Sequence, residues 1–221
     1  MGSTISLTAA DGHSLSAYRA EPAGKVKAGL VVIQEIFGVN QHMRRVADGF
    51  AAAGYLCIAP ALFDRTQRDV ELGYDKDAIE AGRAIRTKIA WDQAMLDVAA
   101  AQRAASAAGK VGSVGYCWGG SVSWLAATRL GVAAAVCYYG GQIAAFAQEK
   151  PGCPVQMHFG EQDKGIPLSD VDKVRQVQPG VDINLYPADH GFNCDERSSY
   201  HAESARLARE RTLAFFSRHL G

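Results

Sequence analysis

Residues 115–120 read GYCWGG and place a cysteine, Cys117, among small neighbours. Residues 110–114 predict a short strand and residues 121–130 predict a helix, so the cysteine lies at a sharp strand-to-helix turn. Such a turn, the nucleophile elbow, strains the nucleophile's backbone and needs glycines where backbones pack closely. The helix N-terminus also favours a thiolate. The motif therefore predicts that Cys117 is a nucleophile, at the position where such turns usually carry serine.

A cysteine at this position needs further groups to activate it. An ordinary thiol has a pKa of about 8.5 and is only a few per cent ionised at neutral pH. The helix terminus contributes about 0.3–1 kcal/mol, which is less than about one pKa unit. In folds built on this elbow, an acid and then a histidine follow the nucleophile, each on a loop after a strand. The sequence can therefore be searched in that order.

The histidine is expected after the last strand, for which residues 182–186 (DINLY) are the candidate. His190 lies on the loop that follows, and Gly191 leaves room beside its ring. We therefore predict that His190 is the base, with a surface loop histidine as the alternative. The other histidines fit a turn, helices or a strand and are interpreted as structural or solvated: His13, His42, His158, His201 and His219.

The acid is expected after the strand at residues 154–159. Asp163 is the candidate, and its role would be to orient the His190 ring and stabilise the imidazolium. Glu161 and Asp170 are competitors. The alternative for Asp163 is an Asx-type turn before the glycine that follows.

The loop after the strand at residues 28–34 begins with Glu35, Ile36 and Phe37. α/β hydrolases place their second oxyanion donor in this loop. The expected donors are therefore the backbone N–H groups of Ile36 and Trp118. A Glu35 carboxylate close to Cys117 would raise the pKa of the thiol, because like charges oppose ionisation. The alternative is that Glu35 is a solvated loop residue.

The rest of the chain supplies the elements that would position these residues. Short β-branched runs alternate with longer amphipathic segments, which predicts an α/β fold: a mostly parallel central sheet flanked by helices on both faces. Strands are expected at residues 3–9, 14–20, 28–34, 55–59, 110–114, 133–139, 154–159 and 182–186. Helices are expected at residues 41–53, 79–108 with a break near Trp91, 121–130 and 202–219. The polar residues 64–77 are interpreted as a candidate mobile cap.

Composition limits the function classes. A length of 221 residues predicts one domain, 1–221. The 23 acidic and 23 basic residues balance, so neither nucleic acid nor a membrane is expected as a partner, and no apolar run reaches the length of a membrane span. The polar N-terminus and five cysteines without framework spacing predict reduced thiols in the cytoplasm. No metal, no cofactor and a monomer or small homo-oligomer are expected.

Taken together, these motifs resemble the dienelactone hydrolase (carboxymethylenebutenolidase) family, a cysteine-nucleophile branch of the α/β hydrolases. The matching segments, in the expected order, are residues 34–40, 115–120, 160–163, 190–192 and 210–216. The resemblance implies a Cys117–His190–Asp163 triad that hydrolyses a small-molecule ester or enol-lactone through an acyl-enzyme. It also implies that Glu35 is the family's extra carboxylate, which keeps the thiol poorly reactive until substrate displaces it.

The chain differs from the family in the residues that would bind a carboxylate group of the substrate. Dienelactone-specific members bind it with two arginines, one of them four residues after the histidine, where this chain has Cys194. The candidate substrate contacts are Phe37, Arg83, Arg86 and Arg197. For the arginines, the alternative is an ordinary surface position.

Other functions use the same residues. An acyltransferase, a thioesterase or a haloacid hydrolase could share the fold. A non-catalytic binding protein would have a broken triad, whereas every triad position here is filled. A thiol redox sensor would need a resolving cysteine, for which Cys194 is the candidate.

Overall fold

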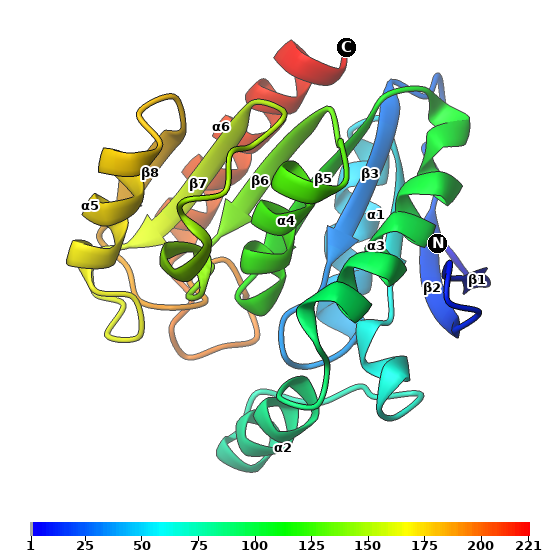
Figure 1. The fold of residues 1–221 in the computed structure, drawn as a ribbon, viewed down its shortest axis with the longest axis horizontal. Coiled ribbons are helices and arrows are strands. Elements are labelled where there is room, and N and C mark those ends of the chain that lie inside the picture. Colours follow the sequence, from blue (N-terminus) through cyan, green and yellow to red (C-terminus); the bar gives the residue numbers. More distant parts are fainter. Residues whose placement is uncertain (1) are drawn as a thin grey trace. The chain divides into compact units, whose positions relative to one another are not determined.

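The computed structural model describes residues 2–221. Their backbone forms two compact units, one ending at Gly112 and the other beginning at Ser113. In each unit, helices lie on both faces of a set of strands (Figure 1), which confirms the α/β class expected from the sequence. The single domain over residues 1–221 stays a prediction.

Four strands form the sheet of the first unit: β1 (Ser3–Thr8), β2 (Ser14–Ala20), β3 (Ala28–Ile33) and β4 (Tyr55–Pro60). Their order is β1-β2-β4-β3. β1 and β2 make an antiparallel hairpin, with Leu7 opposite Leu15, and β3 runs parallel to β4. Every residue of β3 and β4 is buried, as their continuous apolar runs predict.

The helices of the first unit are α1 (Gln41–Ala52), α2 (Lys76–Arg86) and α3 (Trp91–Ala105), with 3₁₀ turns η1 (Leu62–Arg65) and η2 (Ser106–Ala108). α1 and α3 lie on opposite faces of the strands (Figure 1). The helix expected over residues 79–108 is therefore two helices. Ala90 is extended, with ψ of 147°, and separates them, so the break near Trp91 is confirmed. α2 begins earlier than expected because the Asp75 side chain caps it, accepting from the Ala78 N–H at 2.8 Å.

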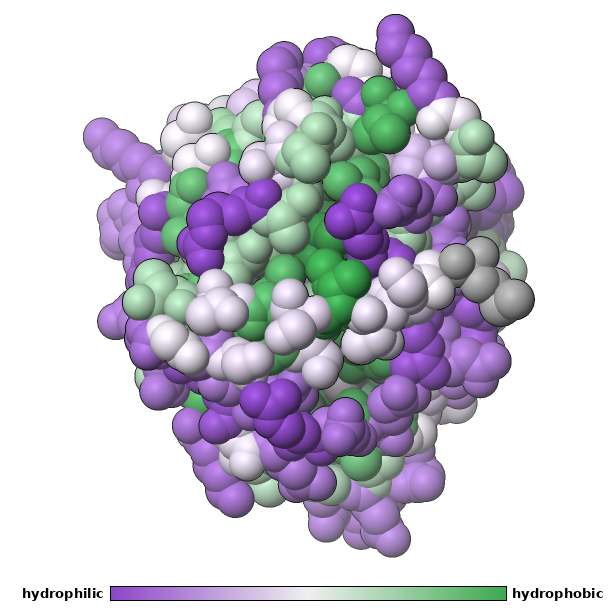
Figure 2. Space-filling view, turned by 90° about the vertical axis from the view of Figure 1, so that its right-hand side faces the viewer, coloured by the Kyte–Doolittle hydropathy of each residue, from purple (hydrophilic) through white to green (hydrophobic). Residues whose placement is uncertain are grey.

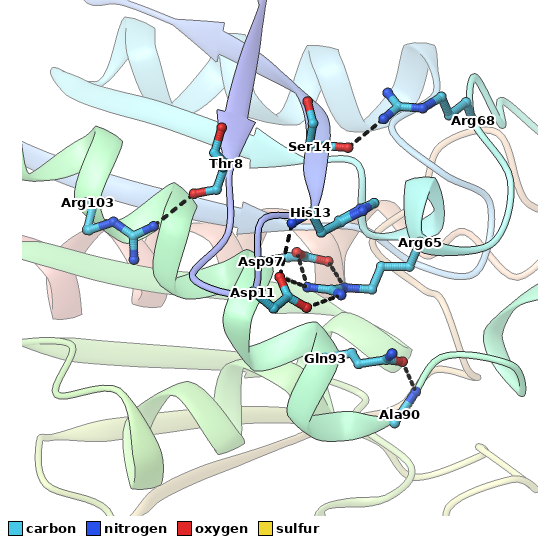
Figure 3. Close-up of polar contacts among 10 residues, drawn as sticks. All are labelled: Thr8, Asp11, His13, Ser14, Arg65, Arg68, Ala90, Gln93, Asp97 and Arg103. Atoms are coloured by element: carbon cyan, nitrogen blue, oxygen red, sulfur yellow. Dashed lines mark hydrogen bonds and ion pairs between the residues drawn. The ribbon is translucent and has the colours of Figure 1, made fainter.

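A charged cluster ties the β1–β2 turn to η1 and α3 (Figure 3). The Arg65 guanidinium donates to Asp11 at 2.6 Å and to both Asp97 oxygens at 2.8 Å. Asp97 is fully buried within α3, and burial raises the pKa of its carboxyl although Arg65 opposes that shift. Removing one partner of such a buried ion pair leaves an unpaired buried charge and lowers the stability of the fold strongly. The cluster therefore holds the β1–β2 turn in place against α3.

The second unit contains β6 (Ala134–Tyr138), β7 (Val155–Gly160), β8 (Asp182–Tyr186) and, from Ser113 onward, β5 (Val111–Tyr116), in the order β5-β6-β7-β8. β6, β7 and β8 are parallel, with Tyr138 opposite His158 and Gly160 opposite Tyr186. The carboxyl ends of these strands therefore meet at one edge, where ligands bind in open α/β sheets.

The helices of the second unit are α4 (Trp118–Arg129), α5 (Leu168–Val177) and α6 (Ala202–Leu220), with the 3₁₀ turn η3 (Ile143–Phe146). α4 lies in front of the strands and α6 behind them in Figure 1. α4 begins three residues before the expected helix at 121–130, because Gly119 and Gly120 continue it back to the elbow.

A buried histidine joins α6 to the strands of this unit. His158 Nδ1 lies 2.8 Å from the Tyr186 hydroxyl, and Nε2 lies 3.1 Å from both Gln156 Oε1 and Thr212 Oγ1. Burial and, to a smaller extent, the nearby Arg211 charge lower the pKa of His158 to about 3. His158 is therefore neutral at physiological pH and acts as part of the core, in line with the structural role expected for it.

Figure 2 shows one face of the molecule, on which hydrophilic side chains cover most of the surface and hydrophobic ones form a narrower band between them. Within the described part of the chain, no helix combines the length and the apolar character needed to cross a bilayer.

Candidate active site

Cys117 occupies the turn between β5 and α4. Its backbone has φ of +56° and ψ of −118°, a region that side-chain-bearing residues rarely adopt. The Cys117 N–H donates to the Tyr138 carbonyl at 3.1 Å, and its own carbonyl accepts from the Gly120 N–H at 3.0 Å. The turn is thus held from both sides, and the thiol is at the first turn of a twelve-residue helix.

Glycines make this close approach possible. A Cβ at Gly115 would overlap the carbonyl oxygen of Gly119, and one at Gly120 would overlap the carbonyl oxygen of Tyr138. Neither backbone oxygen can move without breaking the elbow. At these two positions the space expected from the GYCWGG motif is confirmed.

His190 and Asp163 come together from the loops after β8 and β7. His190 Nδ1 lies 2.7 Å from Asp163 Oδ2. The Asp163 side chain is 1% exposed and that of His190 is 26% exposed, so the carboxylate is shielded and the ring reaches solvent. Asp163 Oδ1 also accepts from the Gly165 N–H at 2.8 Å. The Asx-type turn and the histidine contact are therefore both present, whereas Glu161 is exposed.

The electrostatics of His190 link it to the elbow. Burial lowers the pKa of its imidazole, but the charge of Cys117 and hydrogen bonds with Asp163 and Cys117 raise it more, to about 10. The ring is therefore protonated at neutral pH, and Cys117 is one of its hydrogen-bond partners. An imidazolium beside a thiolate is the pairing that activates cysteine nucleophiles.

The His190 loop is fixed by neighbours that the motif does not reveal. Gly191 has φ of +78°, and a Cβ there would overlap the Arg197 guanidinium. The Ser199 hydroxyl donates to the His190 carbonyl at 2.7 Å, and the Tyr139 ring centroid lies 5.1 Å from that of His190. The sequence analysis did not identify Ser199 or Tyr139 as neighbours of the base. The one available signal was that Tyr139 ends a predicted strand, where site residues are often found.

The remaining candidates for the reaction belong to the first unit, on the loop after β3. The Glu35 residue is 1% exposed, so the interpretation as a solvated loop residue is wrong. The Gln34 side chain donates to the Glu35 carbonyl at 3.2 Å and accepts from the Leu62 N–H at 3.0 Å. Phe37 is also buried, and its ring centroid lies 4.5 Å from that of Tyr74.

The three candidate arginines lie in different settings. Arg83 is exposed on α2. The Arg86 guanidinium stacks over the Trp91 ring, 4.7 Å from its centroid. Arg197 is half-buried and packs against Gly191, next to His190. Arg197 is therefore the arginine that the second unit places beside the candidate base.

Comparison with known proteins agrees with these motifs. The model of the "Dienelactone hydrolase family" matches residues 15–220. Two bacterial proteins named "putative carboxymethylenebutenolidase" are similar: one from Synechocystis sp. is 34% identical, covering 93% of this chain and 92% of its own. The other, from Azospirillum brasilense, is 37% identical and covers 98% and 99%.

Solved structures extend the likeness to the fold. The crystal structure of a "putative dienelactone hydrolase" from Klebsiella pneumoniae superposes with a TM-score of 0.85 at 30% identity, covering 98% of this chain and 99% of that one. A Pyrococcus furiosus esterase superposes with a TM-score of 0.75 at 12% identity, covering 100% and 92%. The second likeness concerns the fold alone.

Proposed function

The chain belongs to the dienelactone hydrolase family and is a lactone or ester hydrolase, and from this premise we propose that Cys117, His190 and Asp163 form its catalytic triad. The observation that carries the proposal is the 2.7 Å contact between His190 Nδ1 and Asp163 Oδ2, on a ring that is also hydrogen-bonded with Cys117. The strained backbone at Cys117 supports it, because such strain is concentrated at functional positions.

In the first half of the reaction, the Cys117 thiolate attacks the carbonyl carbon of the ester or lactone. The carbonyl oxygen becomes an oxyanion and accepts hydrogen bonds from the backbone N–H groups of Trp118 and Ile36. The C–O bond to the leaving group then breaks, and the His190 imidazolium gives its proton to that oxygen. The products of this half are an acyl-thioester on Cys117 and the free alcohol or, for an enol-lactone, the enol end of the same molecule.

In the second half, neutral His190 takes a proton from water, and the hydroxide attacks the thioester carbonyl. The second tetrahedral intermediate expels the Cys117 thiolate, which restores the ion pair with protonated His190. Asp163 stays ionised throughout, holds the ring in one orientation and stabilises its charge. Each oxyanion donor supplies about 3–4 kcal/mol of transition-state stabilisation.

A substrate that carries a carboxylate would find a cation next to this centre. The Arg197 guanidinium packs on the Gly191 turn, directly after the proposed base. Arg83 is the second candidate, whereas Arg86 stacks on Trp91. We therefore assign the carboxylate contact to Arg197, with Arg83 and Phe37 as further candidates on the first unit. A small enol-lactone or ester with a carboxylate is the substrate class that fits this arrangement.

The function is tested by assaying aryl esters, small lactones and a dienelactone, followed by mass spectrometry of the intact protein after rapid acid quench. We expect turnover of at least one class and an acyl adduct on the peptide that contains Cys117. Faster turnover of carboxylate-bearing lactones than of their methyl esters would support the assignment of Arg197. Turnover with an adduct on another residue, or no turnover of any substrate, would contradict the proposal.

Glu35→Gln should change the reactivity of the Cys117 thiol more than the stability of the fold. Glutamine has the same shape and fills the same buried volume but carries no charge, so under the proposed role of Glu35 it removes the like-charge repulsion on the thiolate. We expect iodoacetamide to alkylate Cys117 several times faster at neutral pH. The matched control is Glu161→Gln, at an exposed carboxylate. Equal alkylation rates in wild type and Glu35→Gln would show that the Glu35 charge does not affect the reactivity of the thiol.

A further inference from the structure

One helix of the first unit is packed directly against the loop that follows β3. Gly82 lies in the middle of α2, and a Cβ there would overlap the carbonyl oxygen of Ile36 and come within 3.1 Å of its carbonyl carbon. Glycine is less favourable than alanine in a helix interior, so its use here calls for a packing reason. The reason is that the α2 backbone rests on the Ile36 peptide group with no side chain between them.

The chain that leads into α2 is joined to the same loop. The Leu72 N–H donates to the Phe37 carbonyl at 2.9 Å, and Gly38 forms an isolated β-bridge with Glu71. Gly38 has φ of +78°, and a Cβ on it would overlap the Val70 carbonyl oxygen. The backbone of residues 70–72 therefore packs directly against the backbone of Phe37 and Gly38.

Side chains complete the attachment. Asn40 Nδ2 donates to the Leu72 carbonyl and to the Tyr74 hydroxyl, both at 3.0 Å. The Tyr74 ring packs on Phe37. The loop is thus held at both ends. Gly82 contacts it at Ile36, and residues 71–74 contact it from Phe37 to Asn40.

We propose that α2 is a fixed support for the oxyanion loop and that Gly82 is a positioning residue, which sets the place of the Ile36 backbone. This inference rests on the proposed function, in which the Ile36 N–H is one of the two oxyanion donors. Any side chain at 82 must push the Ile36 carbonyl away, which rotates the backbone about the Cα–C bond of Ile36 and displaces the residue that carries the proposed donor N–H. Oxyanion donors act only when they point at the position that the oxyanion will occupy.

The same contacts give the polar segment before α2 a role different from the mobile cap expected from its composition. From residue 70 onward, this segment is held by backbone and side-chain bonds to the loop at 36–40. In this role the segment packs against the loop at residues 36–40 and helps to set its conformation.

The test compares Gly82→Ala with Gly73→Ala. Gly73 lies in the same segment, and a Cβ there would meet no atom within 4 Å. For Gly82→Ala we expect kcat for an aryl ester to fall about tenfold or more, since losing one donor altogether lowers kcat by about 10²–10³. KM should change less than twofold, and Gly73→Ala should match wild type in both constants.

Two thiol reagents distinguish this role from general damage to the fold. A trifluoromethyl ketone forms a hemithioketal oxyanion with the cysteine and needs the donors, whereas iodoacetamide alkylates the thiolate without them. Gly82→Ala should therefore weaken ketone inhibition about tenfold or more and leave the alkylation rate within about twofold of wild type. Equal losses with both reagents, or no loss with the ketone, would overturn the inference.

A second variant covers the case in which Gly82→Ala does not fold. Tyr74→Ala removes the ring on Phe37 and the hydroxyl that accepts from Asn40 without adding bulk. It should weaken ketone inhibition more than it slows alkylation. If the ketone forms no adduct on Cys117 in wild type, the proposed triad fails; if it does and these variants bind it normally, only the support role fails.

Discussion

Cys117→Ala should abolish ester and lactone hydrolysis while leaving the fold intact. The variant has no nucleophile, and removing the nucleophile of a triad lowers kcat by about 10⁶-fold. Alanine carries the same Cβ into the strained elbow conformation, so the backbone cost is unchanged and the thermal midpoint should move little. The measurements are kcat on the best substrate of the panel and the thermal unfolding midpoint.

Cys117→Ser is the informative companion variant. It keeps a hydroxyl in place of the thiol, but a hydroxyl does not ionise beside His190 as a thiol does. We expect activity well below wild type and no reaction with iodoacetamide at position 117. A Cys117→Ala protein that still turns over substrate at more than about 1% of the wild-type rate would refute the assignment of the nucleophile.

Asp163→Asn should lower kcat by about 10⁴-fold, the effect seen when a triad carboxylate becomes an amide and the histidine is held in the wrong tautomer. The matched control is Glu161→Gln, because Glu161 is an exposed carboxylate two residues away and was its competitor as the acid. The control should retain wild-type kcat. The reverse pattern would identify Glu161 as the acid.

The same variant should also shift the pH dependence. Burial lowers the pKa of His190, whereas the charge of Cys117 and the bond to Asp163 raise it, to about 10 from an ordinary value of 6.5. Protonated His190 therefore stabilises the folded protein fully below about pH 6.5, and this contribution to the free energy of unfolding is lost as the pH rises through about 10. Above that pH the ring also lacks the proton that it gives to the leaving group. Wild-type activity should therefore fall on the alkaline side near pH 10. In Asp163→Asn that limb should move to lower pH, which a pH–rate profile and NMR titration of the His190 ring would detect.

The three residues of the proposed triad could be chosen from the sequence because chain order constrains them. The elbow motif identifies Cys117, and the rule that an acid and then a histidine follow successive strands leaves few candidates. The choice of Asp163 over Glu161 and Asp170 is supported by a contact that spacing alone does not contain, the bond from His190.

What the sequence left open depends on contacts between distant segments. The placement of Arg197 against Gly191 needs the path of the chain from 191 to 197, and the contact of Gly82 with Ile36 joins residues that are 46 positions apart. The start of α2 was missed because its first two residues, Lys76 and Asp77, are charged and continue the polar segment before it, whereas the helix begins where the Asp75 side chain caps it. Glu35 could be read as solvated because a charged residue on a loop usually is; burial there is set by neighbours.

The backbone of Cys117 has a consequence for the history of this position. A residue other than glycine at φ of +56° and ψ of −118° carries strain of about 1–3 kcal/mol, which glycine would not. A chain with glycine at 117 would therefore be more stable and inactive. Drift without selection for turnover would favour that replacement. Relatives that have lost the chemistry should retain the fold and carry glycine at the elbow.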